Sequence, residues 1–259
     1  MLQWTSAETM AWVGHFIWPF FRVGAFFMAV PIIGTQLVPM RVRLMLALVI
    51  TFACLGIVPA MPAVDPLSIA AYFVVGQQII IGVAMAFVLQ LLMQVMVVAG
   101  QFIAMQMGLG FASMVDPVNG VSVAVLSQFY LMLAILLFLA MGGHLVMIEV
   151  LVESFRVMPV SQGLPDASFF GQLAQWGAWM FVAAVVIALP AVTALLIVNF
   201  AFGVMNRAAP QLNIFSLGFP FTMLCGLLIV WVTLNGFVPQ FQDVTGEALT
   251  MMRQLIGLD

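Results

Sequence analysis

Residues 66–115 read PLSIAAYFVVGQQIIIGVAMAFVLQLLMQVMVVAGQFIAMQMGLGFASMV, a stretch of 50 residues without a charged side chain. A single α-helix of that length would measure about 75 Å, because each residue adds ~1.5 Å. The hydrocarbon core of a bilayer is only about 30 Å thick. The stretch must therefore either turn back on itself or extend beyond a flat bilayer.

The rest of the chain is similarly apolar. Hydrophobic residues make up 65% of the 259 residues and charged residues 6%, whereas an average soluble domain has about 45–50% and about 25%. Long uncharged runs are typical of membrane-spanning helices. They predict an all-α, polytopic membrane protein of long helical hairpins, with residues 1–259 in one domain. About six hydrophobic segments are expected, within the uncharged stretches 23–40, 44–64, 66–115, 117–148, 167–206 and 208–242.

Prolines and glycines divide these segments. Proline cannot continue the helical hydrogen-bond ladder, so Pro19, Pro31 and Pro39 should mark helix ends or kinks in the first long segment. Gly163 and Pro165 lie in the clearest predicted loop, residues 160–166. A C-terminal hairpin is expected to follow, over about residues 167–242.

A polar stripe runs along one face of the stretch 66–115 if that stretch is helical. At 100° per residue, Gln90, Gln94 and Gln101 fall within about 40° of one another. Amide groups are poorly solvated by lipid. The stripe is therefore predicted to face other protein, or a wet lumen.

Small residues recur at four-residue spacing in the same stretch. This spacing allows two helix backbones to approach closely. The pairs are Gly82 with Ala86, Gly100 with Ala104 and Gly108 with Ala112. They favour packing of this region against protein.

Residues 105–120, MQMGLGFASMVDPVNG, combine apolar side chains with residues that disfavour a regular helix. Irregular backbone at membrane depth is tolerated only inside protein or along a cavity. The segment therefore predicts either a plug in a pore, with methionines as an adaptable surface, or a buried re-entrant turn without a gating role. The candidate plug residues are Met105, Met107, Gly108, Gly110, Phe111, Met114, Asp116, Pro117 and Gly120.

Arg22 is the one charged residue in the stretch 9–40. A charge at membrane depth is costly, so such an arginine is a candidate for a functional role. Alternatively, its long side chain snorkels to the membrane interface.

The sequence contains no motif that predicts catalysis or a metal site. The patterns H-E-x-x-H, G-x-S-x-G and G-x-x-x-x-G-K-[ST] are absent, and His15 and His144 each stand alone in apolar surroundings. All six basic residues are arginine and the net charge is −3, which argues against a nucleic-acid partner. We expect no enzymatic activity, no cofactor and no bound metal.

Three blocks of sequence are similar to a known family. The C-terminal block reads PAVTALLIVN (190–199), GVMNRAAPQLNIF (203–215) and GFP (218–220). It resembles the signature of the FliR family of type III secretion export-gate proteins, which has a flagellar and an injectisome branch. The pattern of Arg22, Pro31, Pro39 and Arg43-Leu44 resembles the N-terminal block of that family, and FASMVDP (111–117) resembles its central loop.

The resemblance implies a non-enzymatic core subunit of the flagellar export gate, in the bacterial inner membrane and the flagellar basal body. It implies a hetero-oligomeric spiral with FliP-like and FliQ-like subunits, FlhB and FlhA as further partners, and a channel for unfolded flagellar proteins. The central loop, about residues 106–120, would help to seal the pore. Candidate subunit contacts are Arg22, Arg43, Arg207, Pro210, Gln211 and Asn213. An injectisome gate subunit, a self-contained secondary transporter and a structural scaffold are the alternatives.

Overall fold

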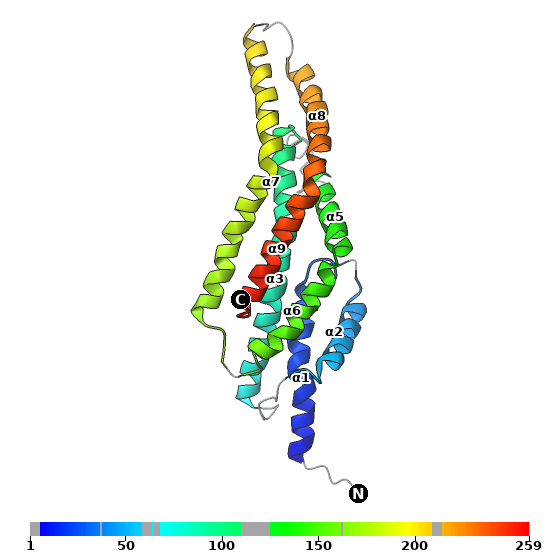
Figure 1. The fold of residues 1–259 in the computed structure, drawn as a ribbon, viewed down its shortest axis with the longest axis vertical. Coiled ribbons are helices and arrows are strands. Elements are labelled where there is room, and N and C mark those ends of the chain that lie inside the picture. Colours follow the sequence, from blue (N-terminus) through cyan, green and yellow to red (C-terminus); the bar gives the residue numbers. More distant parts are fainter. Residues whose placement is uncertain are drawn as a thin grey trace. The chain divides into compact units, whose positions relative to one another are not determined.

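The computed structural model describes residues 6–36, 38–58, 64, 68–109, 125–161, 163–208 and 214–258. Every regular element in this part of the chain is a helix, which confirms the predicted all-α class (Figure 1). The elements are α1 (Ser6–Ala29), α2 (Met40–Cys54), α3 (Ile69–Gln106), α5 (Val125–Ala140), α6 (Gly143–Val157), α7 (Ala167–Ala208), α8 (Ile214–Thr233), the 3-10 helix η1 (Leu234–Gly236) and α9 (Phe237–Leu255).

Helix α3 shows that most of the stretch 66–115 does not turn back on itself. It runs without interruption for 38 residues, which corresponds to about 57 Å at ~1.5 Å per residue. The alternative that this stretch turns back within itself is therefore wrong for residues 69–106. Because these residues include no proline and no charge, nothing in them breaks the helical ladder.

Helix α7 begins where the predicted loop ends. Residues 163–166 are not helical, and Asp166 then caps the helix by accepting hydrogen bonds from the Ser168 hydroxyl (2.8 Å) and the Phe169 backbone N–H (3.1 Å). The same two hydrogen bonds, that of Ser168 first, hold the pKa of Asp166 below its ordinary value. Helix α7 continues for 42 residues with Pro190 inside it.

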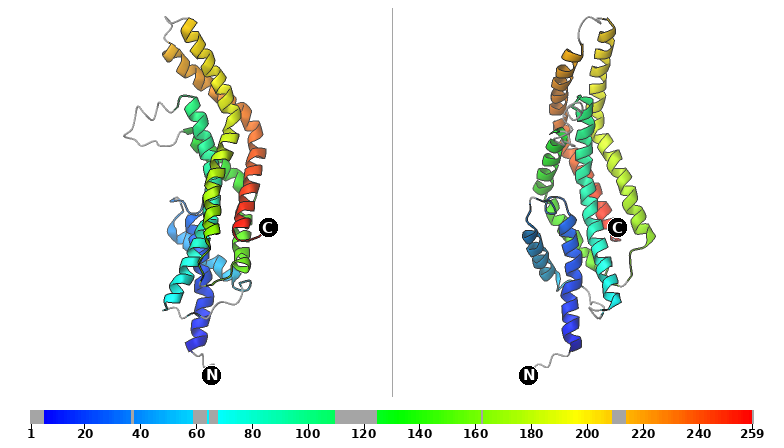
Figure 2. Two further views of the ribbon diagram at one scale, coloured as in Figure 1. Left: turned by 90° about the vertical axis from the view of Figure 1, so that its left-hand side faces the viewer. Right: turned by 180° about the vertical axis from the view of Figure 1, so that it is seen from behind.

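The prolines of the first segment behave in two ways. Helix α1 ends before Pro31 and α2 begins directly after Pro39, as predicted. Pro19, in contrast, lies inside α1 and does not end it. Helices α1 and α2 pack side by side, as the views in Figure 2 show.

Three helical spans in the described residues are long and apolar enough to cross a membrane: Ile69–Gln106, Ala167–Met205 and Pro220–Leu255. A fourth would be the broken pair α5 and α6. Six separate crossings stay a prediction, because α2, α5 and α6 have only 15, 16 and 15 residues, and a helix needs about 20 to span a bilayer.

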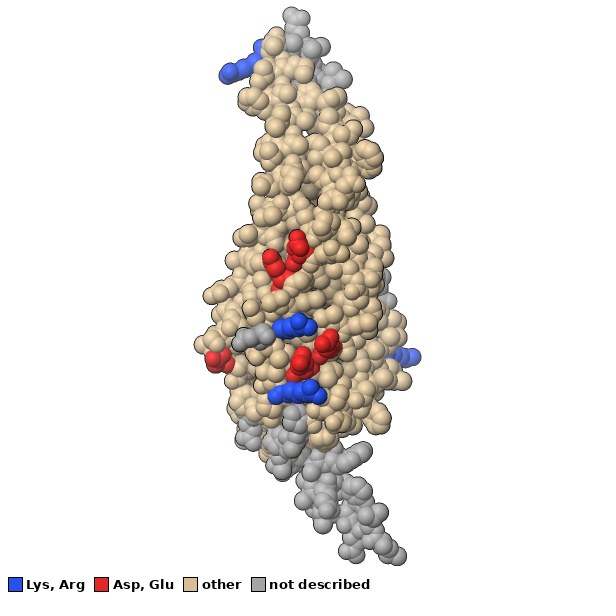
Figure 3. All heavy atoms as spheres, in the orientation of Figure 1, with Lys and Arg blue, Asp and Glu red and all other residues tan. Residues whose placement is uncertain are grey.

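The apolar spans differ in how much of their surface the chain itself covers. The most apolar part of α3 is 67% buried, but those of the second and third spans are only 33% and 22% buried. Phe200 in α7 and Trp231 in α8 are among the exposed large side chains. Charged groups are sparse on the face seen in Figure 3. The uncovered apolar surfaces of the second and third spans therefore require lipid or another protein to cover them.

The chain divides into two compact units that share α3, α7 and α9. The first unit comprises Met1–Leu91, Met141–Gly177 and Gly246–Asp259, and the second comprises Leu92–Ala140 and Ala178–Thr245. The two sites described below each lie within one unit.

Two of the predicted small residues lie where α3 approaches a neighbouring helix. In the first unit, a Cβ atom on Gly82 would overlap the backbone oxygen of Arg22 and lie 3.1 Å from the backbone nitrogen of Phe26. In the second unit, a Cβ atom on Gly100 would lie 2.7 Å from Cα of Ser127 in α5. The predicted close approach of helices is confirmed at these two glycines.

Candidate functional site

Only the start of the predicted plug belongs to the described residues. Met105 is exposed, Met107 is fully buried and Gly108 is half-buried, all at the C-terminal end of α3. Outside the described residues lie Gly110, Phe111, Met114, Asp116, Pro117 and Gly120.

Gly108 ends α3 in a left-handed conformation. Its φ is +83°, which costs glycine little but strains other residues. The Gly108 N–H donates to the Met105 carbonyl and the Leu109 N–H donates to the Ala104 carbonyl, each at 3.0 Å. This pair of hydrogen bonds is the Schellman arrangement of helix C-termini. The predicted effect of Gly108 on the helix is thereby confirmed.

Asn199 of α7 completes the end of α3. The last four carbonyl groups of a helix have no partner within it. Here the Ile103 carbonyl accepts from the Met107 N–H at 3.0 Å, and the Gln106 carbonyl accepts from Asn199 Nδ2 at 3.1 Å. With the two bonds of the Schellman arrangement, each of the four carbonyls has a partner.

The side chain of Met107 packs against α8. A Cβ atom on Gly226 would lie 2.7 Å from Cε and 2.8 Å from Sδ of Met107. The methionine side chain therefore packs directly on the backbone of α8. The end of α3 contacts α7 through Asn199 and α8 through Met107, all within the second unit.

The predicted glutamine stripe is only partly enclosed. Gln90 and Gln94 are exposed and Gln101 is half-buried. Gln90 Nε2 donates to the Ala29 carbonyl, and the Ser127 hydroxyl donates to Gln101 Oε1 at 3.2 Å. That the stripe faces another subunit or a lumen stays a prediction.

Arg22 lies at the centre of a buried polar network in the first unit. Its side chain is 0% exposed, so the snorkelling alternative is wrong. Arg22 Nε donates to Gln78 Oε1 (2.8 Å), Nη1 to the Ser154 carbonyl (2.9 Å) and Nη2 to the Met158 carbonyl (2.7 Å). The guanidinium also lies 4.3 Å from the centre of the Phe155 ring.

The network extends beyond the arginine and joins three elements. Gln78 Nε2 donates to Gln77 Oε1 at 2.9 Å, and Gln77 Nε2 donates to the Ser161 hydroxyl at 2.8 Å. The carbonyls at the C-terminal end of α6 carry the negative end of the helix dipole, which stabilises the cation. Arg22 thus links α1, α3 and the end of α6 inside the chain.

The other candidate subunit contacts are less enclosed. Arg43 is half-buried and its Nη1 donates to the Gly34 carbonyl at 3.3 Å. Arg207 is exposed in the last turn of α7. Pro210, Gln211 and Asn213 lie outside the described residues. Among the three that the structure describes, Arg22 is the one whose side chain is fully buried within its own chain.

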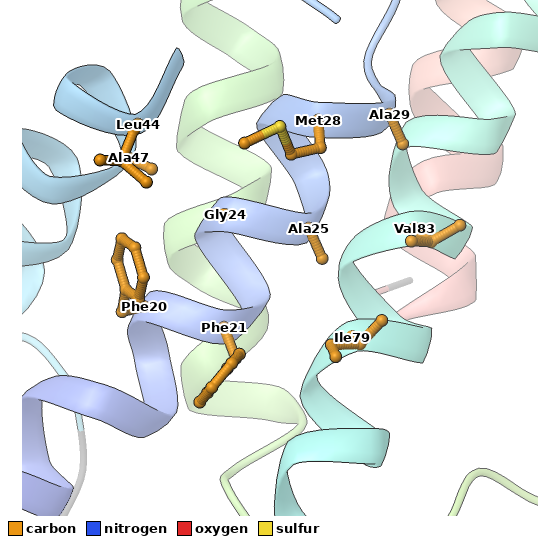
Figure 4. Close-up of a pocket in the computed structure, with 10 residues that line it drawn as sticks. All are labelled: Phe20, Phe21, Gly24, Ala25, Met28, Ala29, Leu44, Ala47, Ile79 and Val83. Carbon is orange, nitrogen blue, oxygen red and sulfur yellow. The ribbon is translucent and has the colours of Figure 1, made fainter. Parts of the chain in front are cut away.

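An apolar cavity in the first unit bears on the transporter alternative. It measures about 420 Å³ and lies between α1, α2 and α3. Its wall is lined by side chains such as Phe20, Leu44 and Ile79 (Figure 4). Small-molecule sites orient a ligand through a few convergent polar groups. This cavity provides none among its lining residues, so it does not support a site for a polar substrate.

Comparison with known proteins extends the resemblance over the whole chain. Bacterial export proteins, family 1, match residues 13–248. The flagellar biosynthetic protein FliR of Escherichia coli (strain K12) is 38% identical, over 99% of this chain and 98% of its own length. FliR of Pectobacterium carotovorum subsp. carotovorum is 36% identical over the same shares, and FliR of Bacillus subtilis (strain 168) is 26% identical over 94% and 95%. The chain therefore belongs to the bacterial export proteins, family 1, together with these FliR proteins.

Proposed function

We propose that the chain is a non-enzymatic core subunit of the flagellar type III protein export gate in the bacterial inner membrane. The observation that carries this proposal is the family match over residues 13–248, which reaches into both structural units. The relatives are flagellar biosynthetic proteins by name, and this favours the flagellar branch over an injectisome gate.

The geometry supports a role within an assembly. Helices α3 and α7 are longer than the ~20 residues that cross a bilayer. Large apolar side chains on α7 and α8 lie uncovered, and the amides of Gln90 and Gln94 are exposed on α3. Protein partners cover such mixed surfaces better than lipid does. FliP-like and FliQ-like subunits in a spiral, with FlhB and FlhA beside them, are the partners we propose.

Within this gate, the segment of residues 106–120 helps to seal the channel until an unfolded flagellar protein passes. The exposed Met105, directly before this segment, supports the role, because a flexible methionine side chain adapts to irregular surfaces. The seal limits leakage of ions and small molecules through the idle gate.

Co-purification tests the assembly. An affinity-tagged chain is expected to bring down FliP-like and FliQ-like subunits from flagellated bacteria. Uptake of a small substrate into liposomes by the purified chain alone would instead support the transporter and contradict the gate.

Replacing residues 110–120 by a Gly/Ser stretch of equal length tests the seal. We expect the gate to assemble normally and the cells to lose membrane potential faster, because apolar side chains no longer fill the channel. The control replaces Leu164 and Pro165 of the predicted loop by Gly and Ser. Equal ion leakage in both variants, with normal assembly, would refute the sealing role.

A further inference from the structure

Asn199 is an unusual residue for its position. It lies in α7, in a run of apolar residues that includes Leu195, which is fully buried, and Phe200, which is exposed. An amide in apolar surroundings costs free energy unless it is hydrogen-bonded. Its Nδ2 donates to a backbone carbonyl of a different helix, that of Gln106.

This hydrogen bond sets the position of α3 relative to α7. Sliding α3 by one residue would move its end by about 1.5 Å and break the bond. Met107, packed on Gly226, imposes the same restriction from α8. The Schellman hydrogen bonds at Gly108 and Leu109 satisfy two carbonyls of the helix end from within the same segment, whereas the Gln106 carbonyl takes its donor from α7, so the end of α3 is tied to a second helix.

We infer that Asn199 and Gly226 are positioning residues for the seal. They fix the point at which the chain leaves α3, and therefore where the segment 110–120 begins. The inference rests on the proposed function, because it assumes that this segment seals the gate. Neither residue needs to line the channel to have this effect.

The first test replaces Asn199 by leucine, which has the same number and branching of side-chain heavy atoms but no donor. We expect normal co-purification with the gate subunits and a roughly five- to tenfold larger ion leak through the idle gate, as expected from the loss of one hydrogen bond. The matched control is Asn235→Leu. Asn235 is exposed, and its Nδ2 donates to the Val232 carbonyl within its own turn at 3.2 Å.

The second test changes the contact between α8 and the Met107 side chain. In Gly226→Ala the new methyl group forces the Met107 side chain out of its place, and we expect a larger ion leak with unchanged assembly. Gly203→Ala is the control, because a Cβ atom on Gly203 in α7 would meet nothing within 4 Å.

The Gly/Ser replacement of residues 110–120 separates the two hypotheses. Suppose that this replacement increases the ion leak, whereas Asn199→Leu and Gly226→Ala assemble normally and leave the ion leak unchanged. The positioning role is then wrong, and the sealing role of the segment stands. If the replacement itself does not leak, the proposed seal fails. Loss of assembly in both point variants, with both controls normal, would assign Asn199 and Gly226 to folding and overturn the positioning role.

Discussion

Replacing Arg22 by lysine is expected to reduce severely the amount of folded and assembled chain, although the positive charge is retained. A guanidinium reaches Gln78, Ser154 and Met158 at once through three nitrogens. A lysine ammonium carries its charge on one nitrogen and cannot reproduce the planar, forked arrangement of donors of a guanidinium. Each buried polar group left without a partner costs about 1–3 kcal/mol.

Removal of the charge by Arg22→Met should have a comparable effect, because the acceptors around it would remain buried without their donor. The measurement is the amount of chain in membranes, together with its co-purification with gate subunits. The control is Arg41→Lys, since Arg41 is exposed on α2. Normal assembly of Arg22→Lys would show that the three-partner geometry is unimportant and that charge alone suffices.

Two glycine substitutions in α3 are expected to have opposite effects. In Gly82→Ala the added Cβ would collide with the backbone of α1 at Arg22 and Phe26, and overpacking of this kind costs about 1–3 kcal/mol. The cost is not relieved easily, because backbone atoms of α1 cannot move aside by a change of rotamer as a side chain can. In Gly76→Ala the Cβ would meet nothing within 4 Å, and replacing a helical glycine by alanine stabilises by about 0.5–1 kcal/mol.

Thermal unfolding in detergent measures both variants. Because 1 kcal/mol corresponds to about 2–4 °C for chains of this size, Gly82→Ala should melt several degrees lower and Gly76→Ala at the same temperature or slightly higher. Equal melting temperatures would contradict the close approach of α1 and α3. The pair shares a helix and a chemical change, so helix propensity cancels in the comparison.

The features that sequence predicted well depend on local composition. Uncharged runs gave the all-α class, Pro31 and Pro39 bounded α1 and α2, and Gly108 ended α3. Each of these effects acts within a few residues along the chain. Sequence similarity gave the family, which residues 13–248 match.

Contacts between distant residues were beyond such reasoning. Arg22 is separated from Gln78 by 56 positions and from Ser154 by 132, so no local pattern revealed its buried partners. Asn199 was visible as a polar residue in an apolar run, but its acceptor lies 93 positions earlier. The number of crossings does not follow from the uncharged runs for a related reason, because the absence of charge does not reveal where a helix stops.

The separation of Arg22 from its partners also has a consequence in time. At roughly 5–20 residues per second, a ribosome needs about 7–26 s to add the 132 residues between Arg22 and Ser154. During this interval α1 is complete but its arginine lacks the acceptors of α6. Arg22 therefore gains its acceptors only after α6 has been synthesised, and the first unit is complete only after residues 246–259 have followed.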